Sequence, residues 1–394
     1  MPKPSLALSS VGPDVVRETP VREVHLPLDG RLPQAACGDK VLKGQRIAES
    51  LAPFSSGEGD LHAPFSGEIL AVSSEHVAIL AGGSGETVPP AALSTSSGEA
   101  LAAALKRLGV ASAALRPAQT LVVGGLEPEP GVGVAAKLLG ARRETLEAGL
   151  ELAVRVIGPE KRRLVLPHGS KAGLPGCEPV FAAPVYPNGL GPMAIRAATG
   201  LENPADAVFL AVHELFALGR VAESGLPLAE TAISAGEELF CVPLGTPAGE
   251  LVKAAGLKAA DGDRVVLGGP MRGRALYGLA QGVGPGDYAL TVIPRGSFPR
   301  MTDSPCLNCG ECVMVCPARI LPGMISRCAE FKLFERTVEY HIDACMDCGL
   351  CGFVCVGRRP VLQYIRLAKK ELADQRNAAC ETSEEEASSC SGKR

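Results

Sequence analysis

Cys306-Leu-Asn-Cys309-Gly-Glu-Cys312-Val-Met-Val-Cys316-Pro317 and Cys345-Met-Asp-Cys348-Gly-Leu-Cys351-Gly-Phe-Val-Cys355 are two stretches of one pattern in the C-terminal part of the chain. Both match the C-x₂-C-x₂-C-x₃-C run of bacterial proteins that carry two [4Fe–4S] clusters. In such a run three closely spaced thiolates hold one cluster, and the fourth cysteine ligates the other. The pattern therefore predicts two clusters, whose chemistry is the transfer of single electrons.

The predicted ligands divide into two crossed sets, which keep the clusters close enough for electrons to pass between them. The two-residue spacers let a tight loop aim backbone N–H groups at the cluster, and such groups tune its potential. Electron transfer needs no general acid, base or nucleophile, so no catalytic residue is expected. One set is Cys306, Cys309, Cys312 and Cys355, and the other is Cys345, Cys348, Cys351 and Cys316.

Zinc is the alternative occupant, because C-x₂-C pairs also bind zinc. A zinc ribbon leaves no role for a third cysteine at the same interval, and here that cysteine occurs twice. Val356 stands where a proline would be expected after Cys355, but proline supplies no ligand. Cys328 lies outside both stretches and is expected to be a buried small hydrophobe. Cys380 and Cys390 lie in a polar tail, where we expect disordered thiols.

The composition indicates a globular protein of two to four domains. The chain has 394 residues and a net charge of only −4, and it offers no basic strip for nucleic acid. No apolar run is long enough to span a bilayer, and no export signal is visible at the N-terminus. Nine of the 14 cysteines lie between Cys306 and Cys355. This clustering indicates metal ligands in a reducing compartment instead of disulfides.

The N-terminal region, residues 1–94, is expected to be short β-structure. Residues 38–48 show a strand–turn–strand pattern with glycines at the turns, and residues 62–69 repeat it. Two such hairpins are similar to the barrel-sandwich of biotinyl and lipoyl carrier domains, although no Met-Lys-Met attachment turn is present. His62 is more often scaffold than ligand in such a turn.

Residues 95–236 alternate between helical and strand patterns, which favours an α/β domain with a mainly parallel sheet. Such sheets bind ligands at the carboxyl ends of their strands, and a strand at residues 120–123 ends in a Gly/Pro-rich loop, residues 124–130. Gly125, Glu127 and Glu129 of this loop are candidates for binding a flavin or nucleotide. The alternative is a plain loop with solvated acids.

Residues 237–295 are expected to form a compact α+β unit. A short helix at 248–255 is followed by a strand and the turn Gly268-Gly-Pro-Met271. The cysteine-rich segment, residues 296–372, completes the ordered chain, and residues 373–394 are expected to be a disordered polar tail. The predicted fold class is thus multidomain, with α/β and α+β parts.

The order of these parts resembles the C subunit of the Rnf electron-transport complex over residues 20–370. The resemblance is carried by the segments Gly38–Gln45, Gly125–Pro130, Tyr186–Gly189 and Gly268–Gly273, followed by the cysteine runs. It implies a carrier-like barrel-sandwich, a domain like the flavoprotein of respiratory complex I, a β-grasp ligand-binding module and a two-cluster ferredoxin-like helical domain. It also matches Glu127 and Glu129 to the acidic loop over the family's nucleotide site.

The resemblance implies an electron-relay subunit of an ion-translocating oxidoreductase, or translocase, peripheral on the cytoplasmic face of the inner membrane. Its partners would be the membrane subunits of the complex, with ferredoxin, a cytochrome or NADH as redox partner, and it would touch the membrane only through those subunits. The resemblance places residues 108–117 where the family carries a glycine-rich loop for FMN and NADH phosphates, and the glycines that expose backbone N–H donors to phosphate are gone from this segment. FMN is therefore a doubtful cofactor.

Two other functions remain open. One is a soluble flavin-dependent NADH oxidoreductase, similar to a cobalamin reductase, on the same scaffold. It requires an intact flavin loop, which residues 108–117 do not provide. The other is a structural protein whose clusters only brace the fold, and such clusters would not cycle reversibly.

Overall fold

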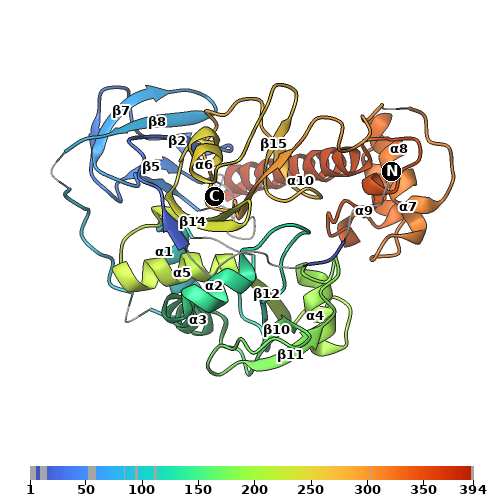
Figure 1. The fold of residues 1–394 in the computed structure, drawn as a ribbon, viewed down its shortest axis with the longest axis horizontal. Helices are drawn as coiled ribbons and strands as arrows, with labels where there is room; N and C mark the ends of the chain where they lie inside the picture. The colour runs from blue at the N-terminus through green and yellow to red at the C-terminus, as the bar shows by residue number, and fades with distance from the viewer. Residues whose placement is uncertain are drawn as a thin grey trace. The chain divides into compact units, whose positions relative to one another are not determined.

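The structure, a computed structural model, forms two compact units, Met1–Arg295 and Gly296–Arg394 (Figure 1). It describes residues 6–8, 16–51, 59–83, 85–93, 96–110, 113–302 and 304–391, without the side chains of residues 377–391. The first unit holds four β-sheets and the helices that cover them. The second unit is helical within its described residues. The protein is thus a mixed α/β multidomain chain, as expected.

Two small sheets form the N-terminal part of the first unit. The alternation of buried and less buried residues in Glu23–Pro27 places Val24 and Leu26 in the core. The predicted strand–turn–strand at residues 38–48 is present, but its two strands pair in different sheets and not with each other. One sheet has the order β2 (Glu23–Pro27), β8 (His76–Ala81), β7 (Gly67–Val72) and β4 (Lys40–Val41), and the other β3 (Leu32–Pro33), β5 (Arg46–Glu49) and β6 (Leu61–His62).

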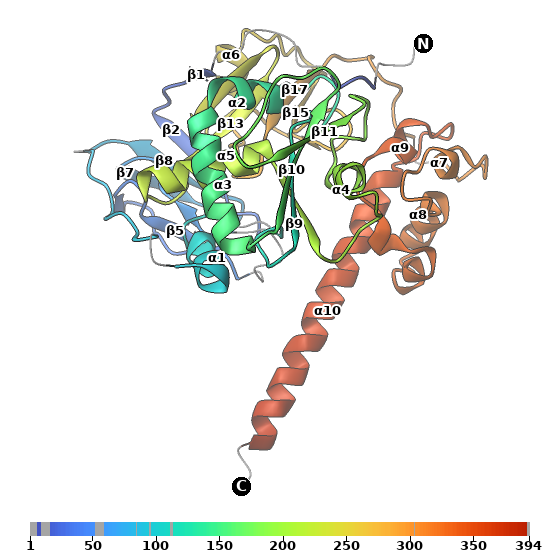
Figure 2. The ribbon, with the colours of Figure 1, turned by 90° about the horizontal axis from the view of Figure 1, so that it is seen from below.

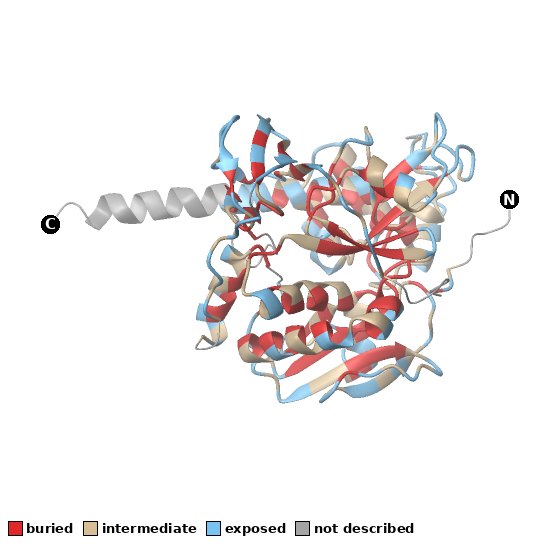
Figure 3. Cartoon of the chain, turned by 60° about the vertical axis from the view of Figure 1, so that its left-hand side comes forward, coloured by how far each residue is buried: buried red, intermediate tan, exposed pale blue. Residues whose placement is uncertain are grey.

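A four-stranded sheet in the middle of this unit is parallel throughout, which confirms the expectation of a parallel α/β sheet. Its strand β9 is buried at every residue, as a strand covered on both faces must be. Figure 3 shows the buried residues of the chain in red, and they include every residue of β9. The sheet order is β11 (Glu178–Ala182), β10 (Lys161–Pro167), β9 (Thr120–Gly124) and β12 (Ala207–Ala211).

Helices cover both faces of the parallel sheet (Figure 2). α3 (Arg143–Ile157) packs closely against α5 (Val212–Ser224), because Gly149 and Gly219 leave no side chain between them. A Cβ on Gly219 would overlap the carbonyl oxygen of Thr145. α4 (Gly191–Thr199) lies against the sheet's other face, and α1 (Gly98–Arg107) and α2 (Ala135–Ala141) pack on α3.

The third part of the first unit is a six-stranded sheet. Its edge strand β1 (Val16–Glu18) comes from the N-terminal extension and runs parallel to β14. The sequence did not predict this strand, because a run of three residues, none of them buried, shows no periodicity. The remaining elements are β14 (Glu238–Pro243), β13 (Glu230–Ala235), β17 (Ala289–Ile293), β15 (Arg264–Leu267) and β16 (Arg274–Ala275), with the short helix α6 (Ala248–Ala254).

The second unit is built from short helices around a small core of Ile320, Ile325, Ile342 and Ile365. Its elements are α7 (Glu311–Met314), α8 (Pro322–Glu330), the 3₁₀ turns η2 (Glu335–Tyr340) and η3 (Ile342–Ala344), α9 (Leu350–Phe353) and α10 (Val361–Ser391). None of the helices in the described part of the chain is both long and apolar enough to cross a bilayer.

Residues 373–394 were expected to be a disordered tail, and the structure differs from this expectation. α10 continues through this segment to Ser391. Between Val361 and Ser391 the sequence contains neither glycine nor proline and is rich in alanine, glutamate and other strong helix formers. Polar composition was therefore a poor guide to disorder here. The side chains of Cys380 and Cys390 lie outside the described residues.

Candidate iron–sulfur sites

The second unit contains two pockets that each gather four cysteines. The first, site 1, encloses about 170 Å³ and is lined by Cys306, Cys309, Cys312 and Cys355. The second, site 2, is narrower and is lined by Cys316, Cys345, Cys348 and Cys351. The structure thus brings together the two crossed sets that the sequence predicts. Four thiols facing one cavity are the donor set that a [4Fe–4S] cluster requires.

The two sites are related by an internal repeat, in which each cysteine of the first motif recurs 39 positions later. Asn308 and Asp347 occupy equivalent positions with φ of 54° and 53°, and Gly310 and Gly349 follow with φ of 80° and 75°. Positive φ at these positions turns the chain sharply after the second residue of each spacer. The repeat continues into α8 and α10, which begin at equivalent positions, Pro322 and Val361.

The linings of the two sites differ in polarity. Besides its cysteines and several apolar residues, site 1 is lined by three polar side chains, those of Asn308, Ser326 and Arg359. Site 2 has apolar neighbours, among them Ile320, Met346 and Ile365. Exposure differs in the same direction. Cys309 of site 1 is exposed, whereas Cys348 and Cys351 of site 2 are 8% and 7% exposed.

Arg359 is a buried arginine beside site 1, with 1% of its side chain exposed. Its backbone N–H points at Cys355 Sγ at 3.4 Å. Its guanidinium donates to the carbonyl oxygen of Ser304 and to Glu330 Oε2, both at 2.7 Å. The charge of a buried arginine must be compensated, and Glu330 does so from α8. Arg359 therefore holds the loop before site 1 and the end of the second motif together.

The residue two positions after the first cysteine of each motif has a different cationic partner in the two sites. Asp347 Oδ1 accepts a hydrogen bond from Lys369 Nζ at 2.9 Å, and Lys369 also donates to the carbonyl oxygen of Cys345. Asn308, the equivalent neutral residue of site 1, lies 3.4 Å from Arg327 Nη1. Site 2 therefore has a compensated ion pair where site 1 has an arginine facing an amide.

Burial favours the protonated thiol at Cys345 and Cys351 of site 2. It raises the pKa of Cys345 to about 11, and it also raises the pKa of Cys351. A thiol in such surroundings ionises when a cation compensates the thiolate, and a coordinating metal does this. Among the described residues, no three His, Cys, Asp or Glu side chains form a group that could hold a single metal ion. The cysteines surround two cavities instead.

No family model matches this chain. Curated proteins similar to it include the C subunits of two bacterial complexes, each similar over most of the length of this chain. The C subunit of the "ion-translocating oxidoreductase complex" of Pseudomonas aeruginosa is 29% identical over 87% of this chain and 51% of that protein. The C subunit of the complex of the same name from Rhodobacter capsulatus is 24% identical over 90% of this chain and 79% of that one. The chain is a sequence relative of these C subunits.

A third relative bears a more detailed name. The C subunit of the "Na(+)-translocating ferredoxin:NAD(+) oxidoreductase complex" of Acetobacterium woodii is 25% identical over 65% of this chain and 63% of that protein. This chain spans about half the length of the Pseudomonas aeruginosa C subunit. Among solved structures, an NAD⁺-reducing [NiFe]-hydrogenase covers 57% of this chain and 48% of that one with 20% identity. Its TM-score of 0.38 is too low to support an argument.

The acidic loop at residues 124–130 is not solvated. Glu127 is 4% exposed, and its carboxylate accepts backbone N–H groups of Val134, Ala135 and Ala136 at 2.8, 3.0 and 3.0 Å. These groups form the start of α2, where an anion is stabilised. Burial raises the pKa of Glu127, and the three N–H groups oppose that rise. Glu127 thus occupies the helix terminus itself.

Glu129 joins the same loop to the turn Gly268–Gly273. Its side chain is fully buried. Its Oε2 accepts the N–H groups of Met271 and Arg272 at 2.7 and 2.9 Å, while Oε1 accepts that of Gly269 and the hydroxyl of Tyr288. A buried carboxylate with four donors is satisfied. The sequence analysis identified the acidic loop and the turn Gly268–Gly273, but it did not predict that the carboxylate of Glu129 binds the turn.

Gly125 is required by packing in this structure. A Cβ there would lie 2.8 Å from both Leu166 Cδ2 and the carbonyl oxygen of Val165. The expectation that Gly125, Glu127 and Glu129 bind a ligand therefore differs from the structure. Neighbouring atoms fill the space beside Gly125, and the carboxylate oxygens of both glutamates already accept hydrogen bonds from within the chain. The residues of this loop do not fit a flavin or nucleotide held by its carboxylates.

A cavity of about 470 Å³ borders the segment that replaces the glycine-rich loop. It is lined by Gly109 and Val110, by Leu210 at the end of β12, and by His213 at the start of α5. Ala111 and Ser112 of this segment lie outside the described residues. The cavity thus lies at the carboxyl end of a strand of the parallel sheet, where such sheets bind ligands.

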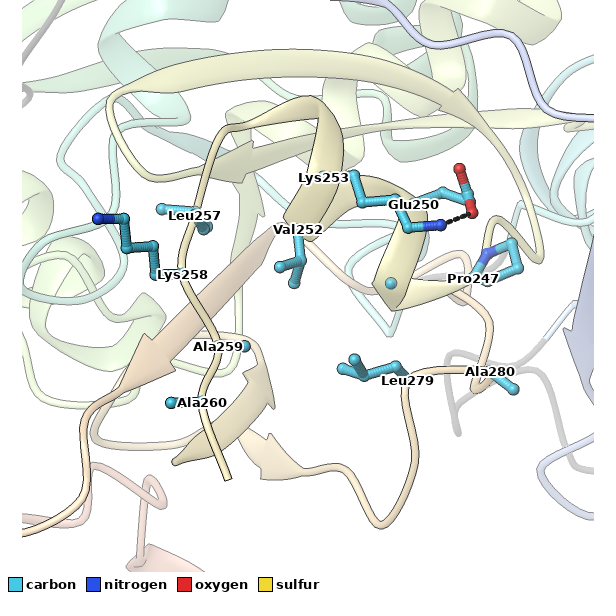
Figure 4. A pocket seen from close by; sticks show the side chains of 11 residues that line it. Pro247, Glu250, Val252, Lys253, Leu257, Lys258, Ala259, Ala260, Leu279 and Ala280 are labelled. Atoms are coloured by element: carbon cyan, nitrogen blue, oxygen red, sulfur yellow. Dashed lines mark hydrogen bonds and ion pairs between the residues drawn. The ribbon is translucent and has the colours of Figure 1, made fainter. Parts of the chain in front are cut away.

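A further cavity, of about 660 Å³, lies over α6 (Figure 4). Its lining is mostly aliphatic, with Val252, Leu257 and Leu279 around it. Lys253 and Glu250 pair with each other at 2.8 Å across one side. Neither cysteine nor histidine is among its lining residues. The pocket offers no redox chemistry, and we assign it no role.

The cysteines were found from sequence, but the residues around them were not. Arg359, Lys369 and Arg327 follow the motifs at spacings that carry no recognisable signature. The internal repeat is the one signal that could have drawn attention to Asn308 and Asp347, since they differ at equivalent positions. Cys328 is 7% exposed on α8, as its reading as a small hydrophobe requires.

Proposed function

We propose that this chain is the electron-relay subunit of a membrane-bound Rnf-type complex, which couples ferredoxin-linked electron transfer to the movement of Na⁺ or H⁺. The observation that carries the proposal is the pair of four-cysteine pockets within one compact unit. The relatives are named as C subunits of ion-translocating oxidoreductase complexes, which supports the same assignment.

In this proposal the eight thiolates of sites 1 and 2 hold the clusters in crossed sets. A [4Fe–4S] cluster, when bound, accepts and donates single electrons. Ile320 and Ile365 keep water from site 2. At site 1 the N–H of Arg359 donates to Cys355 Sγ, and a donor to sulfur favours the more negative, reduced state. No proton needs to move at either site.

The finer domain assignments belong to the same proposal. We assign residues 1–94 to a barrel-sandwich hybrid, 95–236 to a domain like the complex I flavoprotein, 237–295 to a ligand-binding β-grasp module and 296–372 to a two-cluster ferredoxin-like domain. The sheet order supports the first three, since two small sheets precede a parallel sheet and a mixed one.

The proposed partners are the membrane subunits of the complex, with ferredoxin, a cytochrome or NADH as the redox partner. The chain would lie on the cytoplasmic face of the inner membrane through these subunits alone. Cell fractionation tests this. Co-expressed with the membrane subunits, the chain should sediment with the membranes and be released by a high-salt or alkaline wash. Expressed alone it should remain in the supernatant, and sedimentation there would contradict the proposal.

Iron and sulfide analysis of anaerobically purified protein tests the clusters and their crossing. Two [4Fe–4S] clusters require about eight iron and eight sulfide ions per chain. Each of Cys316→Ala and Cys348→Ala should lose one cluster, and the double variant should still lose only one, because both residues belong to site 2. The double variant Cys316→Ala with Cys306→Ala should lose both.

Cys328→Ala is the matched control, because this buried cysteine lies outside both sites, and it should retain both clusters. If the double variant Cys316→Ala with Cys306→Ala retained one cluster, each motif would hold its own and the crossing would be wrong. About two zinc ions and no sulfide in the purified protein would overturn the electron-relay proposal altogether.

A soluble flavin-dependent NADH oxidoreductase is the second candidate, favoured by the 470 Å³ cavity beside residues 108–110. The buried carboxylates of Glu127 and Glu129 count against it. Flavin analysis, followed by titration with NADH and then dithionite under EPR, separates the two functions. The relay predicts cluster reduction by dithionite with no released flavin. One FMN per chain, reduced by NADH, would favour the oxidoreductase.

A further inference from the structure

We infer that the two cluster sites differ in reduction potential, with site 1 the higher, so that electrons pass from site 2 to site 1 and leave through site 1. The inference rests on the proposed function, since it requires both sites to hold clusters. It concerns this chain's own residues, which give equivalent positions of the internal repeat different exposure, polarity and charge.

Exposure gives the first difference. Reduction adds a negative charge to a cluster that four thiolates already make negative, and burial in apolar surroundings disfavours added charge. Cys348 and Cys351 of site 2 are 8% and 7% exposed, and their pocket is lined by aliphatic side chains. Cys309 of site 1 is exposed. Burial therefore lowers the potential of site 2 relative to that of site 1.

Charge gives a second difference of the same sign. At site 2 the carboxylate of Asp347 compensates the ammonium of Lys369, 2.9 Å away. At site 1 the equivalent residue is the neutral Asn308, which faces the guanidinium of Arg327 at 3.4 Å. Asn308 is therefore neutral where Asp347 is negative, so this position carries one negative charge less in site 1 than in site 2. A positive charge near a cluster stabilises its reduced state and raises its potential.

Arg359 adds to this difference. It lines site 1, and its backbone N–H donates toward Cys355 Sγ. The residue of the first motif that is equivalent to Arg359 is Ile320, which lines site 2. Each site therefore receives the residue four positions after its crossing cysteine. In site 1 this is a buried arginine, whose charge Glu330 compensates and which contributes polar N–H groups, and in site 2 it is an aliphatic side chain. Polarity, charge and exposure all favour electrons on site 1.

The exposure of side chains at site 1 indicates where electrons leave the second unit. The thiol of Cys309 and the neighbouring side chain of Leu307, 63% exposed, place site 1 at the surface of the second unit. Tunnelling to a partner falls off with distance, so the exposed site serves as the exchange point. Site 2, enclosed by apolar side chains, then feeds site 1 downhill in energy.

Potentiometric titration monitored by EPR tests the inference, with the full chain purified anaerobically. Asn308→Asp and Asp347→Asn are exchanges of nearly equal size at equivalent positive-φ positions, where both residue types are tolerated. Asn308→Asp should move only the higher midpoint, and move it to a more negative value. Asp347→Asn should move only the lower midpoint, to a more positive value, because Lys369 is then uncompensated.

Asp374→Asn on α10 is the matched control, because this exposed residue makes the same charge change nine positions beyond Ile365, ~14 Å along the helix. It should leave both midpoints in place. The inference is overturned if Asn308→Asp moves the lower midpoint, or if neither exchange moves one cluster selectively. Iron and sulfide analysis keeps this outcome separate from failure of the proposed function, which would show as missing clusters.

Discussion

The hydroxyl of Tyr288 donates a hydrogen bond of 2.5 Å to Oε1 of Glu129, a carboxylate with no exposed surface. Burial, and next the charge of Glu129, raise the pKa of Tyr288, so the hydroxyl remains a donor. The same carboxylate binds backbone N–H groups of the turn at residues 269–272. One buried acid therefore fixes two neighbouring sheets of the first unit to each other.

Removing the hydroxyl in Tyr288→Phe should lower the free energy of unfolding by about 2 kcal/mol, the usual worth of a hydrogen bond to a charged group. Urea unfolding followed by circular dichroism measures the loss. Tyr277→Phe is the control, because Tyr277 also bonds a carboxylate, that of Glu75, but lies at the surface. It should show no measurable loss. Equal losses in the two variants would contradict the role given to Glu129.

Glu127→Ala should destabilise the start of α2, because three backbone N–H groups lose their acceptor in a buried place. Loss of a helix cap alone costs about 1 kcal/mol, and unpaired buried donors add to it. We expect a loss of about 2–3 kcal/mol in urea unfolding. Glu147→Ala, which breaks only an exposed pair with Arg143, should cost less than about 0.5 kcal/mol.

Gly219→Ala should force α3 and α5 apart, since the added methyl group would overlap the carbonyl oxygen of Thr145. Overpacking of this kind costs about 1–3 kcal/mol, and backbone that cannot yield places this case at the upper end. Thermal unfolding by calorimetry gives the measurement. Gly173→Ala is the control, because a Cβ there meets nothing within 4 Å. A Gly219→Ala variant as stable as the parent would refute the close packing.

Stability should fall as the pH falls from 6.5 to 4, in part because of His62. Burial lowers the pKa of His62 from 6.5 to about 4. Between these values the unfolded chain binds a proton that the folded chain does not, so acid favours unfolding. Across this pH window His62 lowers the free energy of unfolding by at most about 3 kcal/mol.

His62→Gln should reduce the pH dependence of the unfolding free energy between pH 6.5 and 4, measured against the parent protein. The part due to His213, whose pKa burial also lowers to about 4, should remain. His168→Gln, at an exposed position in a loop, is the control and should keep the parent's slope. A parent slope in the His62→Gln variant would show that another group titrates in this window.

Removal of iron should affect the two units unequally. The proposed clusters replace much of the core of the second unit, whereas the first unit has its own large core. Calorimetry of chelator-treated protein should show the transition of the second unit lowered or lost, because metal binding contributes folding free energy. The transition of the first unit should stay within a few degrees of its original temperature. Loss of both transitions together would contradict this independence.

The sequence predicted the elements that repeat a strong local pattern. Cysteine spacing assigned the two sets that the structure brings together, and the continuous apolar run at Thr120–Val123 marked a strand buried on both faces. It did not predict β1, because the three residues of this strand are extended only through their pairing with β14. Nor did it predict the hydrogen-bond donors to Glu129, which lie 140 to 159 positions away. Long-range contacts of this kind leave no trace in local periodicity.

The exchange of the fourth cysteine between the two halves of the repeat has a consequence for how the protein is made. A ribosome that has released the chain only as far as residue 344 has supplied three ligands for one cubane and one for the other, so neither can close. In the proposed arrangement the ligands of site 2 are complete only when Cys351 has emerged, and those of site 1 only when Cys355 has emerged. A premature stop codon between the motifs would remove both proposed clusters at once. No truncated chain with a single cluster would then be available to bind a partner protein.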